Sequence, residues 1–473
     1  MQIKGGIILS LKSLFSAKDM TQGSPWKRIL EFSIPMLLGN IAQQLYNTAD
    51  SVIVGYYVGD NALAAVGSAS PILNLLLALF VGISTGAGIV VSQSFGARDR
   101  EGLSKGIGNC ITLTFIATIF IMVVGPIITR PMLQLLDTPD SILEWCANYL
   151  NIYFLGSIGF FFYNMLSGIL RGMGDSVSAL GFLLLAAALN VVLDLWFVAG
   201  FGMGVPGVAL ATVIAQAISA VFCFLKLMSM KEHFDMNRAS VRLEKAYALR
   251  ILKLGIPSGI TQAIMSMSMM VVQSLTNSMG EMVIAANVII MRVDGFAMMP
   301  NFSFGQAMSV YTGQNVGAGK WDRVQKGVIQ GTLISQGFAI TIVAVILTLN
   351  THLFALFTKT QALIDLAGQM MNIMAAGYIA IAITQVLGGV MRGCGNTVTP
   401  MWISICSTVA LRIPVAYVLA YLSRSAEYPN GHPFSLSASL LVSWVMGMVI
   451  SVIAFRYGKT RKMIRRNMAE MNV

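Results

Sequence analysis

Residues 176–199 read SVSALGFLLLAAALNVVLDLWFVA, and Asp194 is the only charged residue in this run of 24. A helix rises about 1.5 Å per residue, so about 20 apolar residues cross the hydrocarbon core of a bilayer. Inside that core a helix satisfies its backbone N–H and C=O groups within its own segment. We therefore predict a membrane-spanning helix over this stretch.

The composition of the whole chain extends this prediction. Of 473 residues, 56% are hydrophobic and only 11% are charged, whereas a soluble domain carries roughly 25% charged residues. So few charges cannot cover a water-facing surface, and we predict an integral membrane protein. The expected spans are 29–54, 63–91, 106–129, 143–170, 176–199, 204–229, 249–277, 283–311, 326–348, 365–390, 397–421 and 434–456.

Lysine and arginine residues lie mostly on alternate connections between these spans, and such residues concentrate on the cytoplasmic side of a membrane protein. With a cytoplasmic N-terminus, the inner connections include 98–105, 231–245 and 456–466, whereas the outer ones hold only Arg130, Lys359 and Arg424. The outer loop after the third span is acidic, with Asp137, Asp140 and Glu144. We expect both termini in the cytoplasm of a cell-membrane protein. Topology then accounts for the net charge of +11 without nucleic acid.

The second half of the chain repeats the first at an offset of 221 residues. Coinciding pairs are Gly59 with Gly280, Gln93 with Gln314, Gly156 with Gly377, Arg171 with Arg392 and Gly174 with Gly395. Six spans per half is an even number, so both halves have the same orientation, and the substrate path is expected between them. We predict an all-α fold of twelve transmembrane helices in two six-helix lobes related by a pseudo-two-fold repeat.

The expected organisation has five parts: an N-terminal segment (1–23), an N-lobe (24–229), a cytoplasmic linker (230–248), a C-lobe (249–456) and a basic tail (457–473). The first 19 residues alternate apolar residues with lysines, which fits an interfacial amphipathic helix. Met20 is an equally good natural start, so this segment is assigned no function.

Nothing in the sequence indicates an enzyme, a metal site or a cofactor. The five cysteines and three histidines have no metal-ligand spacing, and no nucleophile elbow or phosphate loop is present.

Three acidic residues lie well inside the predicted spans: Asp50, Asp194 and Asp294. Each costs roughly 2.5–3.5 kcal/mol at a helix centre, so each needs polar surroundings. Tyr46 and Asn190 precede the first two acids by four residues and share their helical faces.

Thr212 and Asn164 are further polar residues in apolar surroundings. If these side chains converge with Asp50 and Asp194, the two carboxylates would hold a proton or a small cation. Alternatively, each aspartate caps or pairs locally near a helix end. The positions 221 residues after the two acids are Val271 and Val415, so this acidic group belongs to the first half alone.

In the second half, Asp294 either pairs with the nearby Arg292 or faces a cavity where it meets a cationic substrate. Arg412 has two possible roles, bonding the backbone freed by Pro414 or acting in function. The 31 methionines and the aromatic run that includes Tyr163 fit a compliant binding cavity, and they fit lipid-facing or packing surface equally well.

Several stretches resemble the multidrug and toxic compound extrusion (MATE) family. They are SPWKRILEFSIPMLLGNIAQQLYNTADSVIVGYYVG (24–59), the loop SQSFGARDRE (92–101), the turns RGMGDS (171–176) and RGCGNT (392–397), and the pair of Asn190 with Asp194. The resemblance implies a twelve-helix antiporter that is driven by protons or sodium ions and expels bulky cationic amphiphiles.

The resemblance also implies site residues. One bacterial branch of the family has its cation site in the N-lobe, which Tyr46, Asp50, Asn190, Asp194 and Thr212 match, with Asn164 as a looser match. Another branch uses acids on the seventh and tenth helices, where this chain offers only glutamines. We expect substrate contacts from Asp294, Gln262 and Tyr163, and a monomer in the bilayer.

Three alternatives remain open. A major facilitator transporter also has six plus six spans, although its basic loop motif is incomplete here. A flippase or exporter of a lipid-linked or other specific metabolite shares the architecture. A channel or membrane scaffold would not need a buried carboxylate pair.

Overall fold

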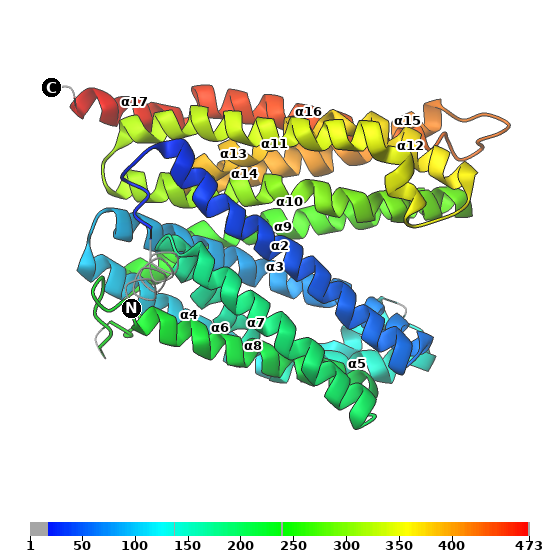
Figure 1. The fold of residues 1–473 in the computed structure, drawn as a ribbon, viewed down its shortest axis with the longest axis horizontal. Coiled ribbons are helices and arrows are strands. Elements are labelled where there is room, and N and C mark those ends of the chain that lie inside the picture. Colours follow the sequence, from blue (N-terminus) through cyan, green and yellow to red (C-terminus); the bar gives the residue numbers. More distant parts are fainter. Residues whose placement is uncertain (1–17, 137, 238–239, 472–473) are drawn as a thin grey trace, which may run out of the picture. The chain divides into compact units, whose positions relative to one another are not determined.

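The computed structural model describes residues 18–136, 138–237 and 240–471, which form helices and loops without a strand (Figure 1). The proposed amphipathic helix before residue 18, Asp137, residues 238–239 of the linker and the last two residues of the tail lie outside this part of the chain. The helices are α2 (Pro25–Tyr57), α3 (Asp60–Gly96), α4 (Arg100–Leu135), α5 (Asp140–Leu155), α6 (Ser157–Gly172), α7 (Ser176–Asp194), η1 (Leu195–Gly200), α8 (Gly204–Met228), α9 (Lys245–Ser278), α10 (Glu281–Gly317), α11 (Trp321–Ala355), α12 (Gln361–Ala375), α13 (Gly377–Gly393), α14 (Val398–Ser404), η2 (Ile405–Arg412), α15 (Ile413–Leu422), α16 (Phe434–Tyr457) and α17 (Lys459–Met471).

These helices confirm the twelve predicted spans. Within the described chain, nine helices are long and apolar enough to cross a membrane, and two bent pairs, α5 with α6 and α12 with α13, raise the number to eleven. The twelfth span is α2, a 33-residue helix whose polar residues, including Asn40, Gln43 and Asp50, lower its hydropathy. Each predicted range coincides with one of these helices, helix pairs or helices continued by a π-helical segment.

The sequence did not predict the two bends. The fourth span bends by 53° at Gly156 and the tenth by 44° before Gly377. A Cβ atom at Gly156 would lie 2.2 Å from Val213 Cγ1, and one at Gly377 would lie 2.4 Å from the ring of Trp444. At each bend, a side chain from another helix occupies the place that a Cβ atom would take. Only glycine, which has no Cβ atom, therefore fits there. These two glycines are a coinciding pair of the sequence repeat.

Two other glycine pairs of the repeat lie in turns that require a left-handed backbone. Gly59, before α3, has φ of +102°, and Gly280, before α10, has φ of +101°. Gly174 and Gly395 likewise have φ of +89° and +82°. A residue with a Cβ is strained there, so the repeated glycines preserve the same turns in both halves.

The described chain forms two compact units. Unit 1 comprises residues 18–19 and Ile34–Gly259, and unit 2 comprises Met20–Ser33 and residues 260–471. In unit 1, α8 packs against α6 and α7, and in unit 2, α13 packs against α10, α11 and α16 (Figure 1). Each unit has its own apolar core. The helices α2 and α9 each begin in one unit and continue in the other.

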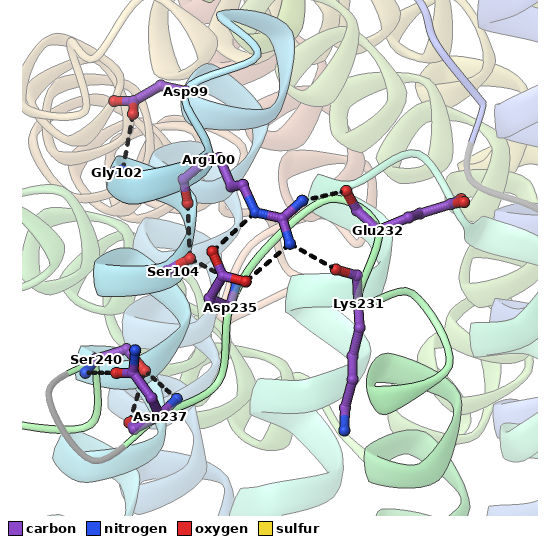
Figure 2. A network of polar contacts seen from close by, with 9 residues as sticks. All are labelled: Asp99, Arg100, Gly102, Ser104, Lys231, Glu232, Asp235, Asn237 and Ser240. Carbon is purple, nitrogen blue, oxygen red and sulfur yellow. Dashed lines mark hydrogen bonds and ion pairs between the residues drawn. The ribbon is translucent and has the colours of Figure 1, made fainter.

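In unit 1, α4 holds the segment that leads into α9. The guanidinium of Arg100 donates two hydrogen bonds of 2.8 Å to the carboxylate of Asp235 and further bonds to the carbonyls of Lys231 and Glu232 (Figure 2). The backbone N–H of Asp235 donates to Ser104 Oγ at 2.8 Å. These bonds hold residues 231–235 on the first turns of α4; we call them the unit 1 clamp.

In unit 2, the end of α10 and the start of α11 hold the segment that leads into α2. Gln314 Oε1 accepts a 2.9 Å bond from the N–H of Met20, and Arg323 donates to the carbonyls of Met20 and Gly23 at 3.1 and 2.7 Å. We call these bonds the unit 2 clamp. The repeat partner Gln93 accepts a 2.6 Å bond from Arg250 on α9. Each unit therefore anchors the start of the helix that then crosses into the other unit.

Candidate functional site

Unit 1 brings the two buried acids together. The carboxyl groups of Asp50 on α2 and Asp194 at the end of α7 lie close enough to share a hydrogen bond. Such a bond needs one proton between the two groups. The Oδ1 atom of each carboxyl is also buried and has no hydrogen-bond partner among the described residues. The pair therefore offers buried oxygen atoms that a proton or a cation could bind.

Neutral polar groups surround this acidic pair. With its amide nitrogen facing Asp194, Asn190 donates to Asp194 Oδ2 at 2.9 Å and accepts from Thr212 Oγ1 at 3.1 Å. The hydroxyl of Tyr46 donates to Thr212 Oγ1 at 3.4 Å. Thus five of the predicted residues, on α2, α7 and α8, form one cluster, which we call the acidic cluster.

Two features of the acidic cluster were not predicted. Tyr153 on α5 shares a hydrogen bond with Thr212 and lies near Asp50. Tyr153 follows Tyr149 by four residues, the same spacing as in the pairs Tyr46 with Asp50 and Asn190 with Asp194. This spacing places the two tyrosines on one helical face, but it does not show which residues of other helices they contact. In addition, the backbone widens into the π-helix η1 directly after Asp194. Such segments are rare and occur frequently at functional sites.

Asn164 and Tyr163 do not join the acidic cluster. Asn164 Nδ2 donates to the carbonyl of Phe160 on its own helix at 2.8 Å. Tyr163 is buried in an apolar cluster of unit 1 and shares a hydrogen bond with Ser167. Gln262, on α9, is exposed.

Unit 2 contains a cavity of about 170 Å³ that Asp294 and Arg412 both line. The hydroxyl of Tyr378 donates to Asp294 Oδ1 at 2.7 Å. Arg292 is exposed, and no ion pair joins it to Asp294 in the described part of the chain, so the expected local pairing is not present. Six methionines give the cavity its apolar wall: Met265, Met269, Met291, Met298, Met370 and Met374.

Arg412 is the last residue of η2, and its side chain is buried. Its Nε atom has no hydrogen-bond partner among the described residues, so the bond to backbone freed by Pro414 is not seen. Within the described chain no group of three or more His, Cys, Asp or Glu side chains could hold a metal ion. The polar centres of the two units are therefore an acidic cluster and a cavity that contains both signs of charge.

Two repeated halves of six spans, each with ionisable groups at the depth of the membrane, define a multi-pass membrane transporter. The model of the MatE family matches residues 35–196 and 257–418, one match in each half. These matches cover 324 of the 473 residues, so the chain belongs to the MatE family. Its members are transporters of small molecules and not enzymes.

Individual proteins agree with this assignment. The chain is 29% identical to the probable multidrug resistance protein YoeA of Bacillus subtilis, over 89% of this chain and 92% of that protein. It is 25% identical to the probable multidrug resistance protein NorM of Thermotoga maritima, over 90% and 89%. Its fold is similar to a solved outward-facing multidrug resistance MATE family transporter, with a TM-score of 0.86, 23% identity and coverage of 96% and 99%.

Proposed function

We propose that this protein is a cation-coupled antiporter that exports organic, cationic amphiphilic compounds, and that the acidic cluster of unit 1 binds the coupling proton or sodium ion. The names of the relatives support multidrug export. The observation that carries the proposal is the contact of Asp50 with Asp194 in surroundings where each keeps one buried oxygen without a partner. Asn164, whose side chain bonds its own helix in this structure, belongs to the proposed site only in a different conformation.

Charge explains why this cluster favours a cation. Two unit charges 4 Å apart interact by about 4 kcal/mol at an effective dielectric of 20, so two bare carboxylates repel each other strongly. A proton or a sodium ion removes that repulsion and fills vacant acceptor sites. The hydroxyls of Tyr46 and Thr212 add neutral oxygen atoms beside the pair.

Helix α2 offers a way to connect the bound cation with movement. It contributes Tyr46 and Asp50 to the cluster and passes from unit 2 to unit 1 after Ser33, next to Pro35. Proline removes one backbone hydrogen bond of the helix and permits a bend. Cation binding shifts the conformational equilibrium only if the two conformations differ in cation affinity. A bend of α2 that changes the Asp50–Asp194 contact supplies such a difference.

The remaining parts of the proposal concern substrate and topology. Asp294 is the acid that attracts a cationic substrate to the unit 2 cavity, whose methionines adapt to varied apolar shapes. Gln262 and Tyr163 are proposed as further substrate contacts. Both termini and the linker 230–248 are cytoplasmic, the lobes are 24–229 and 249–456, and the protein acts as a monomer in the cell membrane.

The test is efflux from proteoliposomes under separately imposed proton and sodium gradients. We expect one gradient to drive export by the wild-type protein and both Asp50→Asn and Asp194→Asn to lose that export while they remain monodisperse and able to bind substrate. Asp140→Asn, which changes an exposed acid at the start of α5, is the matched control and should transport normally. Wild-type rates in Asp50→Asn would remove this residue from the coupling site.

A further inference from the structure

Arg412 carries a positive charge that no described residue balances at close range. Its side chain is only 9% exposed, and none of its nitrogen atoms forms a hydrogen bond or an ion pair within the described chain. A guanidinium has five N–H donors and does not lose its proton in proteins, so it cannot become neutral instead. A buried cation of this kind requires a partner of opposite charge.

The acid in the same cavity does not meet this requirement. Asp294 accepts a hydrogen bond from Tyr378 and forms no ion pair with Arg412. Asp294 therefore interacts with Arg412 only by electrostatic attraction across the cavity. The vacant donor sites of the guanidinium face a space that six methionines also line.

Ser437 supplies a second donor in the same cavity. It is 1% exposed, and its Oγ atom has no hydrogen-bond partner among the described residues. Ser443 Oγ donates to the carbonyl of Ser407 at 2.8 Å, which fixes the register of α16 against η2. These consecutive spans are antiparallel. The five residues from Ser407 on to Arg412 and the six from Ser443 back to Ser437 therefore run in the same direction along the membrane normal. Arg412 and Ser437 therefore lie at nearly the same depth.

We propose that Arg412 is an anion-binding residue of the unit 2 cavity, and that its ligand is an amphiphile with a carboxylate group. The planar guanidinium matches the two oxygens of a carboxylate, and the hydroxyl of Ser437 donates a further bond. The apolar part of the ligand lies among the methionines, whose flexible side chains fit varied shapes. Arg392 also lines the cavity, so two guanidinium groups and the one carboxylate of Asp294 leave one positive charge in a largely apolar wall. This charge suits a monoanion rather than a phosphate dianion.

The π-helical backbone contributes to this site. Arg412 is the last of the eight residues of η2, so the π-helical segment itself carries the guanidinium group. A π-segment shifts the following residues around the helix axis relative to a regular α-helix. It thereby sets the direction in which Arg412 leaves the helix.

Binding of the acid does not depend on the ion coupling proposed above, but its export rests on that proposed function. The variant Asp50→Asn distinguishes binding of the acid from its export. This variant should bind the acid as the wild type does and fail to export it. If Asp50→Asn exports the acid normally, the coupling proposal fails and the binding site stands.

The experiment measures binding of radiolabelled octanoate to the purified full-length protein by scintillation proximity, with octylammonium and octanol as competitors of equal chain length. We expect octanoate to bind saturably and unlabelled octanoate to compete best. Arg412→Gln should weaken binding roughly 100-fold and Ser437→Ala about tenfold. The octanoate affinity of Arg412→Lys should lie between those of the wild type and Arg412→Gln, because lysine keeps the positive charge but lacks the planar pair of donors.

Two further variants keep the test decisive if Arg412→Gln does not fold. Arg424→Gln, which changes an exposed arginine just after the same span, should bind octanoate normally. Asp294→Asn should bind octanoate more tightly, because it removes the negative charge across the cavity. Unchanged octanoate binding in both Arg412→Gln and Ser437→Ala, weaker binding in Asp294→Asn, or better competition by octylammonium than by octanoate would overturn the proposal.

Discussion

The fifth span of each repeat widens into a π-helix beside a buried charged residue, but the charges are opposite. In unit 1, η1 follows Asp194, whose carboxyl meets that of Asp50. In unit 2, η2 ends at Arg412, which shares a cavity with Asp294. The two repeats thus keep the same helix order, bends and glycine turns while their polar centres differ in sign and in packing.

This difference shows which parts of the repeat determine the fold and which determine the chemistry. The glycine pairs at bends and turns coincide because the backbone geometry of both units depends on them. Arg171 and Arg392 coincide, but the charged residues Asp50, Asp194, Asp294 and Arg412 of the two polar centres do not, because the fold does not require them. We infer a division of labour in which unit 1 binds the coupling cation and unit 2 supplies the charged residues that bind the substrate.

The largest expected effect tests this division directly. Asp194→Asn should lower gradient-driven efflux by at least roughly 100-fold for every substrate, because one carboxyl of the pair can no longer ionise. Asp294→Asn should weaken export of cationic dyes about tenfold and leave export of neutral compounds and the gradient dependence unchanged. Efflux of a cationic and a neutral dye is measured for both variants. Equal losses for both dyes in Asp294→Asn would give Asp294 a structural role.

An intermediate effect concerns close helix packing, which both units use. A Cβ atom at Gly82 would lie 2.2 Å from the backbone of Gly259, and one at Gly389 would lie 2.2 Å from the carbonyl of Gly305. Alanine at either position should lower the free energy of unfolding by about 1–3 kcal/mol, because backbone cannot move aside as a side chain can.

Each unit offers a matched control. A Cβ atom at Gly67 on α3 or at Gly337 on α11 would meet no described atom within 4 Å, so alanine there should be neutral or slightly stabilising. Thermal unfolding in detergent compares the four variants. Equal melting temperatures for Gly389→Ala and Gly337→Ala would show that unit 2 tolerates separation of α10 from α13.

The smallest effect distinguishes the two clamps by pH. Hydrogen bonds from Arg100 hold the pKa of Asp235 below its ordinary value. The unit 1 clamp is therefore complete above the pKa of a free aspartate, about 3.9, and weakens as the pH falls through the lowered value. Arg323 in the unit 2 clamp bonds Asn315 and backbone carbonyls, and no described acid forms an ion pair with it.

Amide hydrogen exchange, corrected for its intrinsic pH dependence, measures this difference. Protection of residues 231–235 should be constant from about pH 5 to 8 and fall below about pH 4, whereas protection of Met20–Gly23 should not change. Asp235→Asn should remove the pH dependence in the first segment. A parallel loss in both segments would indicate general unfolding instead of release of one clamp.

Much of the fold could be predicted because span length and hydropathy are local properties of the sequence. All twelve predicted ranges lie on observed spans, and α2 was found despite its low hydropathy, because its apolar residues still outnumber its polar ones. The bends at Gly156 and Gly377 could not be predicted, since they depend on Val213 and Trp444 from distant parts of the chain. The crossing of α2 and α9 between units likewise depends on tertiary packing.

The acidic cluster was predicted more completely than the unit 2 cavity. Tyr46 with Asp50 and Asn190 with Asp194 have a four-residue spacing that places them on shared helical faces. No such local signal joins Asp294 to Tyr378, which lies 84 residues away. That no described residue forms a hydrogen bond or an ion pair with Arg412 is visible only in the three-dimensional structure.

The clamps have a consequence for biosynthesis. Met20 leaves the ribosome before Gln314, which accepts its backbone hydrogen bond and is 294 residues further along the chain. At roughly 5–20 residues per second, this separation is a delay of roughly 15–60 s. The unit 1 clamp has no such delay, because Arg100 has already been synthesised when residues 231–235 leave the ribosome. Unit 1 can therefore fold during translation, whereas unit 2 must bind a segment that was made long before it. Deletion of residues 20–23 should impair the assembly of unit 2.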